Sequence, residues 1–270
     1  MARDKSIIKE ETNYSAYVVN RKALLTLPRF FRACLAQRHI IKVSSKRKRM
    51  QSQAGTGDLF AEVIPAVETE KLADGAFLFR RFAAESAASL VELVSQIARV
   101  SPFRHLVTPG GYRMSVAMTN SGSAGWTSDR QGYRYAKIDP ETGAAWPPMP
   151  VEFQRLAETA AERAGFPGFK PECCLINRYE PGAKLSLHQD RDEKHYEFPI
   201  VSVSLGLPAK FLFGGLARTE RPRRFRLENG DVVVWGGPSR LAFHGVDTLA
   251  DGEHPLTGRC RLNLTFRKAL

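Results

Sequence analysis

The sequence predicts an α+β, mainly β fold: a jelly roll, or double-stranded β-helix, supported by helices. Two observations carry this prediction. The segment 172–270 holds eight short apolar stretches separated by glycine and proline turns, which is typical of a double-sheet β architecture. The segment 58–170 holds two stretches with apolar residues at helical spacing. With 270 residues, 43% of them hydrophobic, the chain is long enough to bury such a core.

The first half begins with a strand expected at residues 76–82, followed by a helix expected at about 84–100. The apolar residues of this helix recur at helical spacing and should form its buried face: Leu90, Leu93, Val94, Ile97 and Val100. Residues 112–118 alternate between apolar and polar side chains, which indicates another strand.

A second helix is expected at about residues 150–164, with Pro150 at its first position and Gly165 and Pro167 closing it. Its buried face should consist of Phe153, Leu156, Ala160 and Ala164. The strands that follow are expected at residues 174–179, 185–190, 200–205, 210–213, 224–227, 231–235, 241–246 and 260–267.

The formal charge of +12 is concentrated near the N-terminus. Residues 1–49 contain 13 Lys/Arg and 3 Asp/Glu, which leaves only +2 for the remaining residues. We expect residues 1–57 to form a basic, poorly ordered extension, because such a segment cannot bury enough apolar surface, and Met50 is an alternative start. A phosphate-binding arm or a targeting segment is the functional alternative.

Cysteine content and hydropathy limit the cellular context. The four cysteines form no C-x-x-C pair and are too few for a disulfide framework. No apolar run approaches the roughly 18 to 20 residues that span a bilayer. We therefore expect a soluble, cytoplasmic protein with no membrane partner.

Residues 119–135 are rich in glycine and serine, yet they carry aromatic and basic side chains. Trp126, Tyr133 and Tyr135 lie near Arg130 and Arg134. On a flexible loop these side chains would suit stacking on bases and contact with phosphates. An equally supported alternative is a loop whose aromatic residues pack back into the core.

A metal site is predicted from one histidine–aspartate pair. His188 and Asp190 are two residues apart, so on a strand their side chains share one face. His244, from a distant strand, would complete a two-histidine, one-carboxylate triad, which binds non-haem Fe(II) and leaves three positions open. The pair alone is weak evidence, because the same spacing recurs in His195 and Glu197.

An acid-binding pocket is predicted beside this triad. Polar residues alternate along the last expected strand, at Arg261, Asn263, Thr265 and Arg267. Guanidinium groups that point into a barrel are costly to bury unpaired, so the row indicates a small dicarboxylate, which guanidinium groups bind at two points. Asn177 and Tyr179 share a strand face and could donate to the same acid. Outward-facing polar residues on an edge strand are the alternative for any one of them.

From about residue 58 to 267 the sequence closely resembles the AlkB family of Fe(II)- and 2-oxoglutarate-dependent dioxygenases. The match is carried by contiguous segments in the same order, at residues 108–112, 125–126, 130–133, 177–179, 181–190, 230–237 and 261–267. The resemblance implies one domain over residues 58–270, with a nucleotide-recognition lid at about 111–140 and a catalytic jelly roll at about 172–270.

The resemblance also implies a role for each matching position. The implied iron ligands are His188, Asp190 and His244. The implied 2-oxoglutarate site comprises Asn177, Arg178, Tyr179, Arg261, Asn263 and Arg267. The implied substrate contacts are Trp126, which would stack on a flipped base, Tyr133, Arg134, Tyr135, Asp192 and Arg218.

The activity that the resemblance implies is oxidative demethylation of N-alkylated DNA bases such as 1-methyladenine and 3-methylcytosine. It would consume 2-oxoglutarate and O2 at one Fe(II) and release formaldehyde, with the protein acting as a monomer on single- or double-stranded DNA. Two alternatives stay open: the same chemistry mainly on RNA, and a nucleic-acid-binding module without catalysis.

Overall fold

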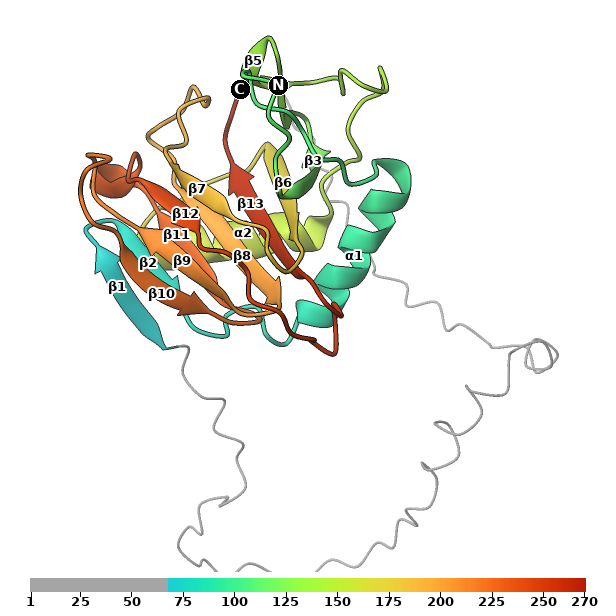
Figure 1. The fold of residues 1–270 in the computed structure, drawn as a ribbon. Coiled ribbons are helices and arrows are strands. Elements are labelled where there is room, and N and C mark those ends of the chain that lie inside the picture. Colours follow the sequence, from blue (N-terminus) through green and yellow to red (C-terminus); the bar gives the residue numbers. More distant parts are fainter. Residues whose placement is uncertain (1–67) are drawn as a thin grey trace, which may run out of the picture. The chain divides into compact units, whose positions relative to one another are not determined.

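The computed structural model describes residues 68–270, so the expectations for residues 1–57 lie outside the described part of the chain. Two sheets face each other, and two helices cover the outer face of the larger one (Figure 1). The elements in chain order are β1 (Thr69–Ala73), β2 (Ala76–Phe79), α1 (Ala87–Val100), β3 (Ala117–Gly122), β4 (Gly125–Asp129), β5 (Gly132–Ala136), α2 (Val151–Arg163), β6 (Cys173–Tyr179), β7 (Leu185–His188), β8 (Ile200–Gly206), β9 (Ala209–Phe213), β10 (Arg223–Leu227), β11 (Val232–Trp235), the 3-10 turn η3 (Gly237–Ser239), β12 (His244–Val246) and β13 (Arg261–Arg267).

The strands β6 to β13 are shared between the two sheets. The larger sheet has the order β1-β2-β11-β8-β13-β6-β3, and the smaller has the order β10-β9-β12-β7. Each sheet therefore takes four of the eight strands predicted for the second half of the chain, and the chain crosses repeatedly between the sheets. This arrangement confirms the predicted jelly roll. Strands β1, β2 and β3 extend the larger sheet at its two edges.

Two apolar layers hold these elements. One lies between the larger sheet and the helices, and the other lies between the two sheets. Helix α2 buries Phe153 and three alanines, whose small side chains let the helix approach the sheet closely. In α1 the predicted stripe is buried at Leu90, Val94 and Ile97. The prediction for Val100 was wrong: it is 73% exposed, because the helix ends there.

The expectation of a flexible loop at residues 119–135 was wrong. This segment holds most of β3, which pairs with β6 in the larger sheet, and the hairpin formed by β4 and β5. The register of the hairpin sets Trp126 opposite Tyr135 and Ser128 opposite Tyr133. A flexible loop was inferred from the glycine content, but the glycines lie at turns: Gly132, with φ 125°, closes the hairpin.

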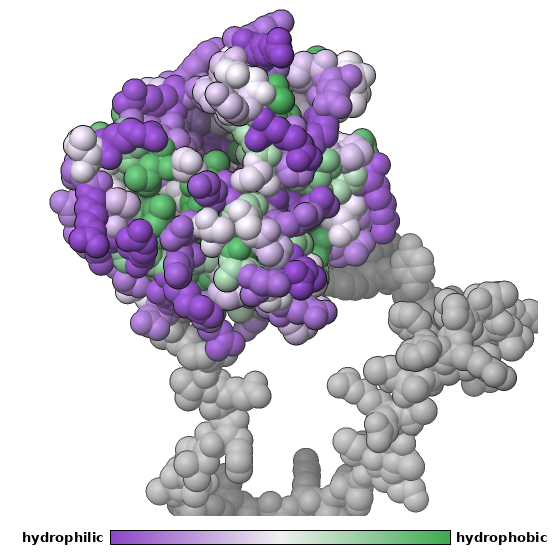
Figure 2. Space-filling model, in the orientation of Figure 1, coloured by the Kyte–Doolittle hydropathy of each residue, from purple (hydrophilic) through white to green (hydrophobic). Residues whose placement is uncertain are grey.

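The surface and the helices complete the description. Figure 2 shows a mostly hydrophilic face with smaller groups of apolar residues between the polar ones. No helix within residues 68–270 is both long and apolar enough to cross a membrane.

Candidate active site

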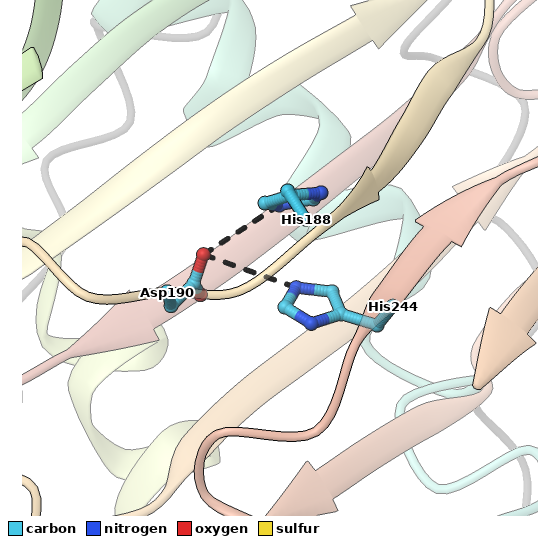
Figure 3. A group of neighbouring side chains, drawn as sticks. All are labelled: His188, Asp190 and His244. Atoms are coloured by element: carbon cyan, nitrogen blue, oxygen red, sulfur yellow. Dashed lines mark ion pairs between the residues drawn. The ribbon is translucent and has the colours of Figure 1, made fainter. Parts of the chain in front are cut away.

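The three predicted metal ligands meet at one end of the smaller sheet. Strands β7 and β12 are antiparallel neighbours and place His188 opposite His244. Asp190 follows the end of β7, and its Oδ1 lies 3.6 Å from Nε2 of His188 and 3.8 Å from Nε2 of His244 (Figure 3). The ligand atoms of the three residues all lie within 4.8 Å of one another. Because β7 ends at His188, a turn rather than strand alternation brings Asp190 into the group.

Hydrogen bonds to backbone carbonyl oxygens determine which nitrogen of each imidazole carries a proton. Nδ1 of His188 lies 2.9 Å from the Ser186 carbonyl oxygen, and Nδ1 of His244 lies 3.0 Å from that of Ala242. A carbonyl oxygen only accepts, so each Nδ1 carries the proton and each Nε2 presents a lone pair toward Asp190. Burial, and then the neighbouring His188 ring, lower the pKa of His244 to about 3. The ring is therefore neutral near pH 7, as a metal ligand must be.

A guanidinium group orients the carboxylate of Asp190. Its Oδ2 accepts hydrogen bonds from Nε and Nη2 of Arg267, at 2.8 and 2.7 Å. Oδ1 thus remains directed at the two imidazoles. Burial alone would raise the pKa of Asp190, but Arg267, His244 and His188 together hold it below its ordinary value. The result is an anionic oxygen beside two imidazole Nε2 atoms, a donor set that fits Fe(II).

The predicted acid-binding residues line the inner face of the larger sheet. The register of β13 and β6 sets Arg261 opposite Tyr179 and Asn263 opposite Asn177, and all four are buried. Nη2 of Arg261 donates to Ser204 Oγ at 2.9 Å. Its Nε and Nη1, and Nη1 of Arg267, have no hydrogen-bond partner among the described residues.

These unpaired donors are the strongest local indication of a bound anion. Arg261 is only 1% exposed, and burial lowers its pKa. A buried cation without an anionic partner is costly, and a carboxylate would offset that cost. The donors and the metal ligands line one cavity of about 670 Å³ between the sheets. The residues present therefore fit Fe(II) together with 2-oxoglutarate.

Arg178 is the member of the predicted set that does not reach this cavity. It follows Asn177 on β6, so its side chain points to the opposite face of the sheet. There its Nη2 lies 3.3 Å from Glu180 and its guanidinium lies 4.9 Å from the Phe103 ring centroid. The assignment of Arg178 to 2-oxoglutarate binding is corrected accordingly.

Replacing Arg178 with alanine should leave the KM for 2-oxoglutarate within about twofold of wild type, because the side chain is separated from the cavity by the sheet. Titration of 2-oxoglutarate in a formaldehyde-release assay measures this. A KM increase comparable to that of an Arg261 variant would contradict the placement.

The predicted substrate residues gather at the mouth of the cavity in part. Trp126 stacks on Tyr133 with ring centroids 5.6 Å apart and planes 15° apart. The Trp126 indole donates through Nε1 to Asp192 Oδ2 at 2.8 Å. All three residues line the cavity, as does Tyr135.

Two predicted substrate contacts lie elsewhere. Arg134 points away from Tyr133 and Tyr135, because side chains alternate along β5, and it binds both carboxylate oxygens of Asp129 at 2.9 and 2.7 Å. It therefore braces the hairpin and does not line the cavity, and its contact with substrate stays a prediction. Arg218 lies at the rim, where its Nη1 donates to the Leu187 carbonyl oxygen at 2.7 Å.

Sequence reasoning missed Glu193, which lies buried behind the metal ligands. Its Oε1 accepts from the Tyr135 hydroxyl at 2.6 Å and lies 3.3 Å from Nε of Arg267. Its Oε2 accepts from Nη2 of Arg240 at 3.2 Å, and the same guanidinium donates through Nη1 to the Asp190 carbonyl oxygen at 3.2 Å. Glu193 thus joins the hairpin to the residues around Asp190. Glu193 lies in a polar segment of the sequence, where an acid is expected to be exposed to solvent, so no local pattern reveals that it is buried.

Comparison with known proteins agrees with this site. The 2OG-Fe(II) oxygenase superfamily matches residues 75–267. The alpha-ketoglutarate-dependent dioxygenase AlkB of Escherichia coli is 59% identical over 212 residues, which cover 78% of this chain and 97% of that protein. The AlkB homolog of Caulobacter vibrioides is 48% identical over 182 residues, 67% of this chain and 81% of that protein.

The solved structure of OsALKBH1 is similar in fold, with a TM-score of 0.67 and 30% sequence identity. The match covers 74% of this chain and all of that one. With the iron triad, the buried guanidinium donors and the jelly roll in place, this chain belongs to the AlkB family of Fe(II)- and 2-oxoglutarate-dependent dioxygenases.

Proposed function

We propose that this enzyme removes alkyl groups from the ring nitrogens of DNA bases such as 1-methyladenine and 3-methylcytosine, restoring the base and releasing formaldehyde. The observation that carries the proposal is the mouth of the cavity, where the stacked rings of Trp126 and Tyr133 and the carboxylate of Asp192 stand beside the metal ligands. A planar, positively charged ring suits such a mouth.

When bound, Fe(II) and 2-oxoglutarate supply the chemistry by which O2 oxidises a C–H bond. The residues of the chain hold these groups in place. His188, His244 and Asp190 would bind the metal, and Arg267 would keep the carboxylate of Asp190 turned toward it. Arg261 would bind the far carboxylate of 2-oxoglutarate, while the free Nη1 of Arg267 and Asn177 would serve the end nearest the metal.

Base recognition would follow from three groups at the mouth. His188 is partly exposed, with 35% of its side chain accessible, and Trp126 lines the same cavity. A base turned out of its stack would lie between the two rings. Asp192 would attract the cationic ring. The Trp126 indole donates to Oδ2 of Asp192, and the carboxylate can still accept a hydrogen bond from the base. An alkylated base that cannot pair leaves the duplex at lower cost than an intact one.

RNA is the competing substrate. Among the relatives are a DNA N(6)-methyladenine demethylase of Arabidopsis thaliana and a tRNA demethylase of Schizosaccharomyces pombe. The carboxylate and the aromatic pair would recognise the same lesion in either polymer. We favour DNA, the polymer that the sequence resemblance implies, and we propose that a monomer acts on either single- or double-stranded substrate.

The direct test is formaldehyde release in the presence of Fe(II), 2-oxoglutarate and air. Matched DNA and RNA oligonucleotides would carry one 1-methyladenine or 3-methylcytosine. Release at comparable or higher kcat/KM from DNA is expected, and its loss in His188→Ala would tie it to the metal site. Turnover of RNA alone would overturn the proposed preference, and release from neither polymer would overturn the function.

A further inference from the structure

A group of arginines lies along the far edge of the smaller sheet, outside the cavity. Residues 218–226 contain five arginines and one acid, in a stretch where the chain enters and forms β10. The acid, Glu220, accepts the Ala217 backbone N–H at 2.9 Å and so is held within its own turn. Because residues 50–270 together carry a formal charge of only +2, this concentration of positive charge is local.

Six basic side chains of this region are exposed. Arg218 and Arg223 donate to the backbone carbonyl oxygens of Leu187 and Leu72. The other four form what we call the basic row: Lys210, Arg221, Arg224 and Arg226. On β10, Phe225 and Leu227 face the other sheet, so Arg224 and Arg226 point outward. The register sets Arg226 directly opposite Lys210 on β9. Like charges in that position destabilise a strand pair, so the fold tolerates a local cost to keep them.

The row keeps most of its capacity for an external anion. Arg221 makes no hydrogen bond or ion pair with the described residues. Arg224 lies 3.8 Å from Asp247, and Arg226 lies 2.9 Å from Glu228, but all four side chains are 41% to 68% exposed. Ion pairs in such positions contribute little, and a phosphate can compete for the guanidinium groups.

The position of the row relative to the metal site defines a path. In register across the sheet, His188 of β7 lies opposite His244 of β12, His244 lies opposite Phe213 of β9, and Phe213 lies opposite Arg223 of β10. Three steps between strands span about 14 Å, or about four nucleotide steps along a duplex. Arg218 donates to the carbonyl oxygen of Leu187, the residue before His188, and precedes Arg221 by three residues.

From this geometry we infer that the basic row binds the phosphate backbone of the same nucleic acid, several nucleotides away from the base in the cavity. The inference rests on the proposed function. Its contacts are with phosphates alone, so it adds affinity for substrates long enough to reach it, without adding sequence preference. A trinucleotide is too short to reach the row.

A charged edge strand has a second explanation, which the experiment must separate. Basic residues on an edge strand also prevent sheets from pairing edge to edge. That role requires charge on β10 but predicts no dependence on the length of the substrate.

The test compares two full-length triple variants with equal loss of charge. One is Arg221→Gln/Arg224→Gln/Arg226→Gln. Its control is Arg99→Gln/Arg155→Gln/Arg259→Gln, which removes three exposed arginines from other faces. Substrates are a trinucleotide and a 15-mer single strand, each with one central 1-methyladenine, assayed at several salt concentrations.

For the row variant we expect a KM for the 15-mer raised roughly tenfold or more, and a log–log salt slope shallower by about two for three lost phosphate contacts. Its kcat/KM on the trinucleotide should stay within about twofold of wild type. An Arg→Lys triple variant should retain the salt slope. Equal KM and slope in the row variant and the control would overturn the inference, as would aggregation of the row variant without a change in DNA affinity.

Failure of the proposed function would look different. In that case wild type would release no formaldehyde from either substrate. Fluorescence anisotropy with an unmodified labelled 15-mer would still measure the affinity and the salt slope of the three proteins, so the row is tested independently of turnover.

Discussion

Replacing Asp190 with asparagine is expected to abolish formaldehyde release and to weaken binding of Co(II), used as a spectroscopic probe of the metal site, by at least about 100-fold. Loss of a residue that only hydrogen-bonds to a metal ligand costs about 10- to 100-fold, and here a charged ligand is lost. Isothermal titration with Co(II) and the visible spectrum of the complex measure the effect. Metal binding at wild-type strength in Asp190→Asn would contradict the assigned triad.

The same substitution should destabilise the metal-free protein. Arg267 loses the charge of its buried partner, which costs roughly 3 to 5 kcal/mol. The pKa of Asp190 is lowered in the folded state, so this stabilisation is fully present above the ordinary carboxyl pKa of about 4 and is lost as the pH falls below it.

Urea unfolding in the presence of chelator measures the free energy of unfolding of wild type and of Asp190→Asn. The difference between them should be constant from about pH 8 to 5 and should become smaller at lower pH. Asp251→Asn is the control, because Asp251 belongs to an exposed ion pair with Arg259 and should change stability little. If the difference in free energy of unfolding stayed the same well below pH 4, the stability of the protein would not depend on the ion pair between Arg267 and this carboxylate.

Replacing Arg261 with methionine should separate stability from activity. Two of the guanidinium nitrogens of Arg261 have no hydrogen-bond partner within residues 68–270, and burial lowers its pKa. An apolar side chain of similar volume avoids the free-energy cost of burying these donors without partners, so the melting temperature should stay the same or rise. The KM for 2-oxoglutarate should rise roughly 30-fold or more, since truncating one partner of a buried charge pair costs about 2 to 5 kcal/mol.

Arg240→Met provides the contrast. Arg240 is equally buried, but its nitrogens donate to the carbonyl oxygens of Phe198 and Asp190 and to the carboxylate of Glu193. Its removal leaves those acceptors without a donor and should lower the melting temperature markedly. If Arg261→Met lowered it as much, Arg261 would be a structural residue rather than a ligand-binding one.

The second half of the chain could be predicted well because its strands have clear local sequence patterns. Each is a short apolar run between turn residues, and β6 to β13 lie within a few residues of where they were expected. The metal triad was predictable for a related reason: histidine and aspartate at a two-residue spacing, next to a buried row of arginines, leave few other uses for those side chains.

Other features depend on contacts that no local pattern encodes. The β4–β5 hairpin has the composition of a loop, and only the pairing of the two strands with each other reveals its structure. The face of Arg178 could have been read from strand alternation, but its position in a contiguous family segment favoured the wrong assignment. Glu193 is a buried ion-pair partner because two arginines, 47 and 74 residues later in the chain, converge on it.

The hydroxyl that ties Tyr135 to Glu193 divides the hairpin into a fixed base and a free tip. The base shares hydrogen bonds with the groups around Asp190, so a substitution that displaces it would also disturb the iron carboxylate. The turn at residues 130–132 carries no such tie. Substitutions at the tip could therefore change the range of lesions that the enzyme accepts. They would not alter the oxidation chemistry at the iron, because the tip is not bonded to the residues around Asp190.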